Sequence, residues 1–236
     1  MKAERSVPVK ITRPGLSGVV HRKRLFGLLD ARTKSPVVWV TSPAGSGKTT
    51  LVSSYLGSRG IPCIWYQCDE GDSDPATFFY YMGLAAKNAA PRRRKPLPLL
   101  TPEYLQGIGT FARRYFEELY DLIASLDLAD KGPPSSPSLK KRKGRFAIVF
   151  DNYQDVPAGS SFHDIIASGL DIVPDNIHIL VISRSDPPPQ MARLNANGRI
   201  GILEYDDLRF TFGESRELLL PRTLSSPIPL PFSHDR

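Results

Sequence analysis

The chain has 236 residues, of which 41% are hydrophobic, and it carries a net charge of +7 at pH 7. This length and composition can fill a sizeable core, which excludes a wholly disordered chain and fits one domain of ordinary size. The positive charge would suit a nucleic acid, an anionic membrane or a polyphosphate ligand, so its sign alone does not select a partner.

Much of the positive charge lies in two basic runs, 92–95 and 140–143, which both stand next to prolines. Such a context is typical of surface loops. We interpret the runs as solvated loop charge, with a nucleic-acid contact as the alternative.

The cysteines and the apolar runs exclude further classes of protein. Cys63 and Cys68 are five residues apart, and there is no other cysteine. This favours reduced core thiols over a disulfide framework or a zinc site. The longest apolar runs are far shorter than a membrane span, and the N-terminus leads into no apolar segment. We therefore expect a cytoplasmic protein without membrane contact.

Short apolar runs alternate with helical patterns along the chain. Runs rich in β-branched and aromatic residues are typical of strands buried on both faces, and the helical stretches begin near Thr, Asp or Pro. In chain order we expect a strand at 37–40, a helix at 49–58, a strand at 61–66, helices at 75–89 and 102–126, strands at 146–150 and 177–182, and a weaker strand at 200–204. This alternation predicts an α/β fold with helices on both faces of a parallel five-stranded sheet, for which we expect the order 2-3-4-1-5.

Two segments depart from this pattern. Residues 130–144 are dense in Pro, Ser, Lys and Arg, which predicts a flexible surface insertion before the third strand. The stretch 208–220 begins like a helix, and four prolines without any pattern follow. We expect one domain over 1–215, an irregular tail over 216–236, and a chain that is truncated relative to a longer protein.

The segment between the first strand and the first helix has the pattern of a phosphate-binding loop. Its residues are Ser42, Pro43, Ala44, Gly45, Ser46, Gly47, Lys48, Thr49 and Thr50. The glycines let successive backbone N–H groups turn toward phosphates, and the helix N-terminus adds partial positive charge. Lys48 is expected to reach the β- and γ-phosphates from the solvent side, and Thr49 to ligate Mg²⁺. Ser42 replaces the first glycine of GxxxxGK(S/T), so the alternative is a chance Gly/Ser turn that ends in Lys-Thr.

Asp151 follows the apolar run 146–150 and supplies the second half of such a site. A carboxylate at the end of this strand can face the metal that Thr49 holds, so Asp151 is the Walker B candidate. Asn152 stands where many hydrolysing relatives place a second acid. An amide cannot act as a base, which predicts slow hydrolysis or a role for Asp151 in organising the water.

Arg184 ends the fourth strand and is followed by a proline-rich turn. Because the carboxyl ends of parallel strands line the ligand crevice, Arg184 can reach the γ-phosphate and is the sensor candidate. The alternative is a surface arginine. Asp69, Glu70 and Asp72 follow the second strand on the same edge, with either a supporting role or the role of a solvated acidic loop.

These residues together resemble the ATPase domain of the STAND class, signal-transduction ATPases with numerous domains, in the branch of the maltose-regulon activator and other large LuxR-type regulators. The resemblance spans about residues 8–215. The matching stretches are 10–14, 37–51 with its SPAGxGKTT loop, 65–72, 150–153 and 183–184 with the prolines that follow. In that branch the first loop position is often Ser, which fits Ser42.

The resemblance implies a switch in which ADP holds the resting monomer and inducer with ATP opens it. The opened full-length protein would then self-associate and activate transcription. It also makes Arg22, which follows Val20 and His21, a candidate nucleotide contact, whose alternative is a basic residue that starts a helix. The winged-helix segment, the sensor repeats and the DNA-binding helix-turn-helix are missing, so we expect no sequence-specific DNA binding by this chain.

We therefore expect a regulatory ATPase module that binds ATP or ADP with Mg²⁺. It would be a weak ATPase, converting ATP and water to ADP and phosphate, with Asp151, Lys48 and Arg184 as the residues that act on the phosphates. The alternatives are a DNA-handling P-loop ATPase, a small-molecule kinase, or an inactive truncated chain. Salt-dependent DNA binding would favour the first of these alternatives.

Overall fold

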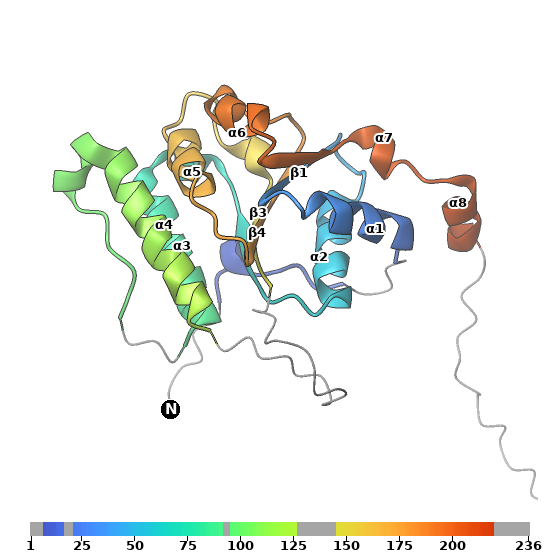
Figure 1. Cartoon of the computed structure of the whole chain (residues 1–236), viewed down its shortest axis with the longest axis horizontal. Helices are drawn as coiled ribbons and strands as arrows, with labels where there is room; N and C mark the ends of the chain where they lie inside the picture. Colours follow the sequence, from blue (N-terminus) through green and yellow to red (C-terminus); the bar gives the residue numbers. More distant parts are fainter. Residues whose placement is uncertain (1–6, 17–20, 92–94, 127–144, 220–236) are drawn as a thin grey trace, which may run out of the picture.

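The computed structural model describes residues 7–16, 21–91, 95–126 and 145–219 (Figure 1). The expected insertion at 130–144, the basic runs at 92–94 and 140–143, and the tail beyond residue 219 lie outside the described residues. Among the described residues, no helix is both long and apolar enough to cross a membrane.

A five-stranded sheet forms the centre of the molecule, and every pairing in it is parallel. The strands are β1 (Val37–Thr41), β2 (Cys63–Gln67), β3 (Phe146–Asp151), β4 (Ile177–Ser183) and β5 (Ile200–Leu203). The order is β2-β3-β4-β1-β5, as the sequence predicts. Because β1 lies between β4 and β5, the loop that follows β1 starts at the carboxyl edge of the sheet with a strand on either side.

The helices form a layer on each face (Figure 1). On one face lie α3 (Pro75–Ala89), α4 (Ile108–Ala124), α5 (Phe162–Leu170) and α6 (Ala192–Ala196), and on the other α1 (Lys23–Arg32) and α2 (Lys48–Ser58). The chain continues through α7 (Tyr205–Leu208) and α8 (Phe212–Leu219). Short 3-10 turns are η1 (Val9–Ile11), η2 (Glu70–Ser73), η3 (Pro102–Gly107), η4 (Tyr153–Asp155) and η5 (Pro189–Met191).

Two elements differ from the sequence prediction for reasons of backbone chemistry. The helix expected at 102–126 is divided into η3 and α4, because Gly107 leaves the helical conformation (φ −125°, ψ 38°). Strand β2 begins at Cys63 rather than at Ile61. Pro62 precedes it and has no N–H to donate, although its carbonyl accepts a hydrogen bond from Ala147 N at 3.0 Å.

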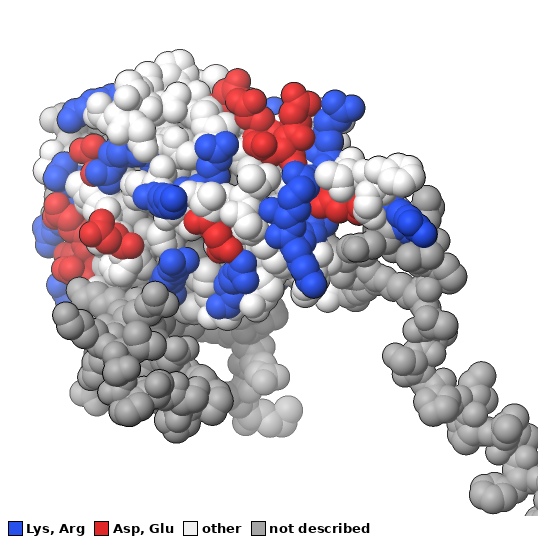
Figure 2. All heavy atoms as spheres, turned by 45° about the vertical axis from the view of Figure 1, so that its right-hand side comes forward, with Lys and Arg blue, Asp and Glu red and all other residues white. Residues whose placement is uncertain are grey.

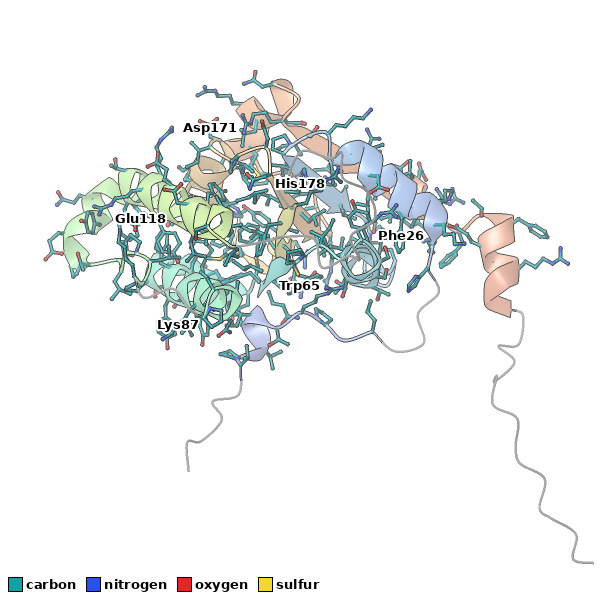
Figure 3. The ribbon with its side chains drawn as sticks, turned by 60° about the horizontal axis from the view of Figure 1, so that its bottom comes forward. Phe26, Trp65, Lys87, Glu118, Asp171 and His178 are labelled. Carbon is teal, nitrogen blue, oxygen red and sulfur yellow. The ribbon has the colours of Figure 1, made fainter. Side chains whose placement is uncertain are left out.

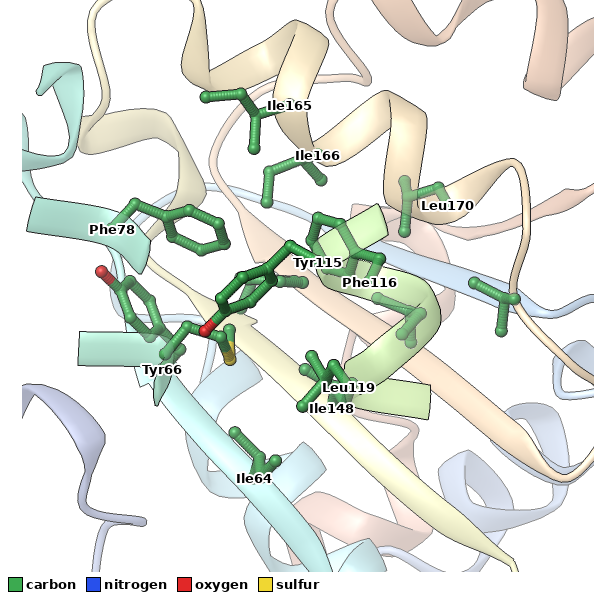
Figure 4. Packing of buried hydrophobic residues seen from close by; sticks show 14 of the residues in the cluster. Ile64, Tyr66, Phe78, Tyr115, Phe116, Leu119, Ile148, Ile165, Ile166 and Leu170 are labelled. Carbon is green, nitrogen blue, oxygen red and sulfur yellow. The ribbon is translucent and has the colours of Figure 1, made fainter. Parts of the chain in front are cut away.

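Each face of the sheet buries its own hydrophobic core, because successive side chains of a strand point to opposite faces. Trp39 of β1 packs into the larger core with α3, α4 and α5, whereas Val38 and Val40 pack against α1 and α2. Figure 4 shows Phe78 and Phe116 of the larger core above the sheet. Figure 3 shows Phe26 of α1 and Trp65 of β2, which belong to the smaller core.

Helices α4 and α5 approach each other closely at Gly169. A Cβ at this position would lie 2.5 Å from the ring of Phe116, so a larger residue would require the Phe116 ring or one of the two helices to move. Tyr120 of α4 donates a hydrogen bond to the carbonyl of Gly169 at 3.0 Å. The close packing of α4 against α5 therefore depends on a glycine at position 169.

Candidate functional site

The loop between β1 and α2 turns through two glycines with left-handed backbones, Gly45 (φ 79°) and Gly47 (φ 80°). A Cβ at either position would meet no atom within 4 Å, so glycine is required here by backbone conformation rather than by space. Gly47 is the N-cap of α2 and accepts a hydrogen bond from Leu51 N at 2.8 Å. The loop thus brings backbone N–H groups to the N-terminus of a buried helix, which favours an anion.

Lys48 lies folded into the curve of this loop. Its Nζ donates hydrogen bonds to the carbonyls of Ser42 at 2.5 Å and Pro43 at 2.9 Å, and Ser42 and Ser46 are joined through their hydroxyls. Desolvation and the nearby charge of Arg184 lower the pKa of Lys48, while Asp151 opposes them. The residue is only 8% exposed, so the expectation of a solvent-side lysine is wrong. Because the hydrogen-bond acceptors of the Lys48 ammonium are all neutral here, an anionic ligand would stabilise its charge.

Thr49 and Asp151 meet at the carboxyl edge, although 102 residues separate them. The Thr49 hydroxyl donates a hydrogen bond to Oδ1 of Asp151 at 3.0 Å, and Asn152 N donates to the same oxygen at 3.0 Å. Asp151 is 1% exposed, and desolvation raises its pKa against the opposing effect of these two hydrogen bonds. A hydroxyl at the start of α2 and a carboxylate at the end of β3 are oxygen ligands of the kind that Mg²⁺ takes in nucleotide sites, so the pair fits that ion.

Arg184 lies at the end of β4, next to the phosphate loop. Ser42 N donates a hydrogen bond to the carbonyl of Ser183 at 3.3 Å, which joins the loop to this strand end. Arg184 is exposed, and its charge acts on Lys48. The structure therefore brings Lys48, Thr49, Asp151 and Arg184 to one edge of the sheet.

The side chain of Arg22 is bound by residues of the segment that follows β5. It is the N-cap residue of α1, and its guanidinium donates to the carbonyls of Leu208 and Arg209, both at 2.8 Å, and to the carboxylate of Glu214. Only 10% of its side chain is exposed. A nucleotide contact by Arg22 stays a prediction.

Among the acidic residues after β2, Asp72 is part of the folded core rather than of a solvated loop. The carboxylate of Asp72 has no exposed surface and accepts hydrogen bonds from Lys10 Nζ at 2.9 Å, Tyr66 Oη at 2.6 Å and Asp69 N at 2.9 Å. A solvated acidic loop is therefore wrong for Asp72. The ion pair between Lys10 and Asp72 holds the N-terminal segment beside the edge strand β2. It could not be expected from the sequence, because the two residues are 62 positions apart.

Gln154 in η4 is a further polar residue at this edge, and its place in the site was not expected from the sequence. Its Oε1 accepts a hydrogen bond from Arg184 N at 2.9 Å. The only signal in the sequence is its position three residues after Asp151, in the loop that follows the strand.

A parallel sheet of this order, with a glycine loop between β1 and α2 and an aspartate at the end of β3, defines a P-loop nucleoside triphosphatase fold. No family model matches the sequence. The sequence is similar to proteins called HTH-type transcriptional regulator MalT. The relative from Vibrio cholerae serotype O1 is 30% identical over 196 residues, which are 80% of this chain and 19% of the relative. The relative from Klebsiella pneumoniae subsp. pneumoniae is 28% identical over 225 residues, 94% of this chain and 22% of the relative.

The chain is thus a homologue of one segment of the MalT-type regulators and spans about a fifth of their length. Solved structures with a similar arrangement include the Walker-type ATPase PABY2304 of Pyrococcus abyssi, at a TM-score of 0.48 and 15% identity over 84% of this chain and 56% of that one. The Aeropyrum pernix ORC1 protein in complex with DNA gives a TM-score of 0.44 and 15% identity over 86% of this chain and 49% of that one.

Proposed function

We propose that the chain binds ATP with Mg²⁺ and acts as the regulatory ATPase module of a MalT-like transcriptional regulator. The observation that carries this proposal is the contact between Thr49 and Asp151 at 3.0 Å, directly beside the phosphate loop. A hydroxyl at the start of α2 and a carboxylate at the end of β3 meet there, and packing of the hydrophobic core does not require this contact.

Each residue has a role that follows from its position. The backbone N–H groups of 45–50 and the N-terminus of α2 would hold the phosphates, and Lys48 would exchange its carbonyl acceptors for β- and γ-phosphate oxygens. Thr49 and Asp151 would hold Mg²⁺, which when bound neutralises charge on the β- and γ-phosphates. Arg184 would contact the γ-phosphate. Hydrolysis would be slow, because Asn152 offers an amide where a second acid would orient water.

The functions of the longer relatives are proposals for the protein to which this segment corresponds. By that relationship, ADP would favour a resting form and ATP an active form that self-associates. Sensing of an inducer and sequence-specific DNA reading would reside outside the matched segment, and this chain by itself would read no DNA sequence.

A DNA-handling ATPase has little support from the described surface. On the face in Figure 2, Lys and Arg side chains are interspersed with Asp and Glu. Several basic side chains are also paired with carboxylates, such as Arg114 with Glu118 and Arg59 with Asp30. A continuous basic track along a nucleic-acid backbone would need unpaired cations.

A small-molecule kinase needs an acceptor pocket beside the transferred phosphate. A cavity of about 360 Å³ is lined by His21, Lys23, Phe26, Ser58 and Arg59. Ser58 is the last residue of α2 and Lys48 the first. At 1.5 Å per residue, the cavity is therefore roughly 15 Å along the helix from the phosphate loop. This cavity is too remote to present an acceptor.

The replacement Lys48→Ala tests the proposal. We expect it to lower Mg·ATP affinity at least about 100-fold, because charge-assisted hydrogen bonds to phosphate are lost. The measurement is a calorimetric or fluorescent-nucleotide titration, with thermal melting to confirm folding. The matched control is Lys34→Ala, an exposed lysine at the opposite end of β1, which should leave affinity unchanged. Wild-type affinity in Lys48→Ala would refute the site.

A further inference from the structure

The turn after β4, residues 183–185, is fixed by hydrogen bonds from several sides. Ser42 N donates to the carbonyl of Ser183 at 3.3 Å. The indole Nε1 of the fully buried Trp39 donates to the carbonyl of Ser185 at 2.9 Å. Ser185 N donates to the hydroxyl of Ser183 at 3.1 Å. The residues before and after Arg184 are therefore anchored to β1 and to the phosphate loop.

Gln154 holds Arg184 itself. Its Oε1 accepts a hydrogen bond from Arg184 N at 2.9 Å, while its Nε2 donates to Oδ1 of Asp155 at 2.9 Å. The acceptor and the donor of the amide are thus both used, and this fixes the orientation of the group. The backbone N–H of Arg184 is thus bound by a side chain of η4 that is 30 residues away in sequence.

The path of the chain after β3 explains how Gln154 reaches this place. Asn152 has a left-handed backbone (φ 57°, ψ 38°), and Asp155 N donates a hydrogen bond to its carbonyl at 2.9 Å. Tyr153 is buried below, with its ring 5.0 Å from that of Trp39 at 69°. The tight turn that directly follows Asp151 therefore turns Gln154 toward β4, so that one side chain connects the ends of both strands.

We propose that Gln154 is a positioning residue, which sets the backbone of Arg184 so that the guanidinium is directed at the third phosphate of ATP. This inference rests on the proposed function. The guanidinium of Arg184 is exposed, and its charge reaches Lys48 in the phosphate loop, so a fixed backbone limits its search to side-chain rotation. ADP has no third phosphate. Gln154 therefore acts on the preference for ATP over ADP and not on the binding of nucleotides in general.

The experiment is a double-mutant cycle on the whole chain, with Mg·ATP and Mg·ADP titrated separately. Gln154→Met keeps the length and packing of the side chain but removes both hydrogen bonds. We expect it to weaken ATP binding about 3- to 10-fold, the range of one neutral hydrogen bond, and to leave ADP binding unchanged. Arg184→Ala should weaken ATP binding further. In the Arg184→Ala background, Gln154→Met should have an effect of less than about 2-fold, because the residue acts through Arg184.

Gln106→Ala, on an exposed glutamine of η3, is the control that should change neither titration. Thermal melting establishes that each variant folds. The inference is overturned if Gln154→Met weakens ATP and ADP equally, or if its effect persists in full without Arg184. Failure of the wild-type chain to bind either nucleotide would instead overturn the proposed function, and this inference with it.

Discussion

Asn152 is the residue at which the chain leaves the sheet beside Asp151. Among the described residues it is the only non-glycine residue with a positive φ. Asn and Asp enter this left-handed conformation more readily than other side chains. The local backbone would therefore accept either residue, and the difference between them is chemical: a carboxylate can accept a proton from water, and an amide cannot.

We expect the wild-type chain to hydrolyse ATP below the roughly 1–100 s⁻¹ of kinases, and Asn152→Asp to be faster by about tenfold or more, since positioned bases contribute strongly to rate. Steady-state phosphate release measures both. Asn152→Gly is the matched control, because it also fits a positive φ but supplies no base. If Asn152→Asp is no faster than Asn152→Gly, the identity of this residue does not limit hydrolysis.

At the scale of elements, the chain after β5 is fastened to the start of α1 by two arginines. Arg22 donates to the carbonyls of Leu208 and Arg209 and to Glu214 of α8, and its guanidinium lies 3.9 Å from the centroid of the Phe210 ring. Arg24 also donates to Arg209 O at 2.9 Å. Glu214 is therefore the acid at the centre of this contact.

Glu214→Gln should release the segment from α1. Partial burial by itself would raise the pKa of Glu214, but hydrogen bonds from Arg22, Thr211 N and Arg24 hold that pKa at about 2, below its ordinary 4.5. At pH 7 we expect protection factors of the amides at 205–214 to fall about 10- to 100-fold, the range of a hydrogen bond to a charged group. Hydrogen exchange measures this local opening.

The pH dependence of that difference follows from the lowered pKa. The stabilising contribution is fully present above the unfolded pKa of 4.5 and is lost as the pH falls toward 2. The variant and the wild-type chain should therefore differ equally at pH 7 and pH 5 and converge below 4.5. Glu117→Gln, in an exposed pair with Arg113, should change no protection factor. A difference that stays constant down to pH 2 would assign the effect to packing instead of charge.

The elements that could be predicted are those whose signal is local. The strands β1, β3 and β4 are continuous apolar runs, and their predicted and observed bounds agree within one residue. Helix α3 begins at Pro75 after Asp74, whose side chain accepts a hydrogen bond from Ala76 N. Helix α1 was expected only through the alternative interpretation of Arg22 as a basic residue that starts a helix, because no capping side chain marks this start. Helix α8 begins later than expected, after α7 and the break at Arg209.

In the candidate site, too, the residues that could be predicted are those with a local sequence signal. Positions 42–50 and Asp151 could be selected because a loop and a strand end are local patterns. The partners of Lys10, Arg22 and Gln154 could not, since their hydrogen bonds join residues that are 62, 192 and 30 positions apart. The pair of Gln154 and Arg184 depends on β3 and β4 lying side by side. The other two pairs depend on η1 packing against β2 and on residues 208–214 reaching the start of α1. Contact of any of these residues with a nucleotide stays a prediction.

On the scale of the whole molecule, the positive charge is unevenly divided. Residues outside the described ranges contain 12 of the 31 Lys and Arg but only 4 of the 24 Asp and Glu, which leaves 19 against 20 in the described part. The described residues are thus nearly neutral, and the whole net charge of +7 comes from the other segments. Any attraction to DNA should come from sequence such as 92–94 and 140–143.

We therefore expect the chain to bind DNA weakly and without sequence preference. Replacing Lys140, Lys141, Arg142 and Lys143 by Gln should remove most of this binding and leave Mg·ATP affinity unchanged. The reason is that contacts to phosphates release counterions, so each lost cation reduces the salt slope by roughly 0.9.

Fluorescence anisotropy at several salt concentrations measures the slope, and a footprint on candidate promoter DNA tests specificity. The control replaces Arg113 and Arg114, which are paired with Glu117 and Glu118, and should change little. Two results would contradict the proposed regulatory ATPase module: a protected DNA sequence in the footprint, or DNA binding at high salt that survives the replacement of 140–143. Either result would favour a protein that acts on DNA directly.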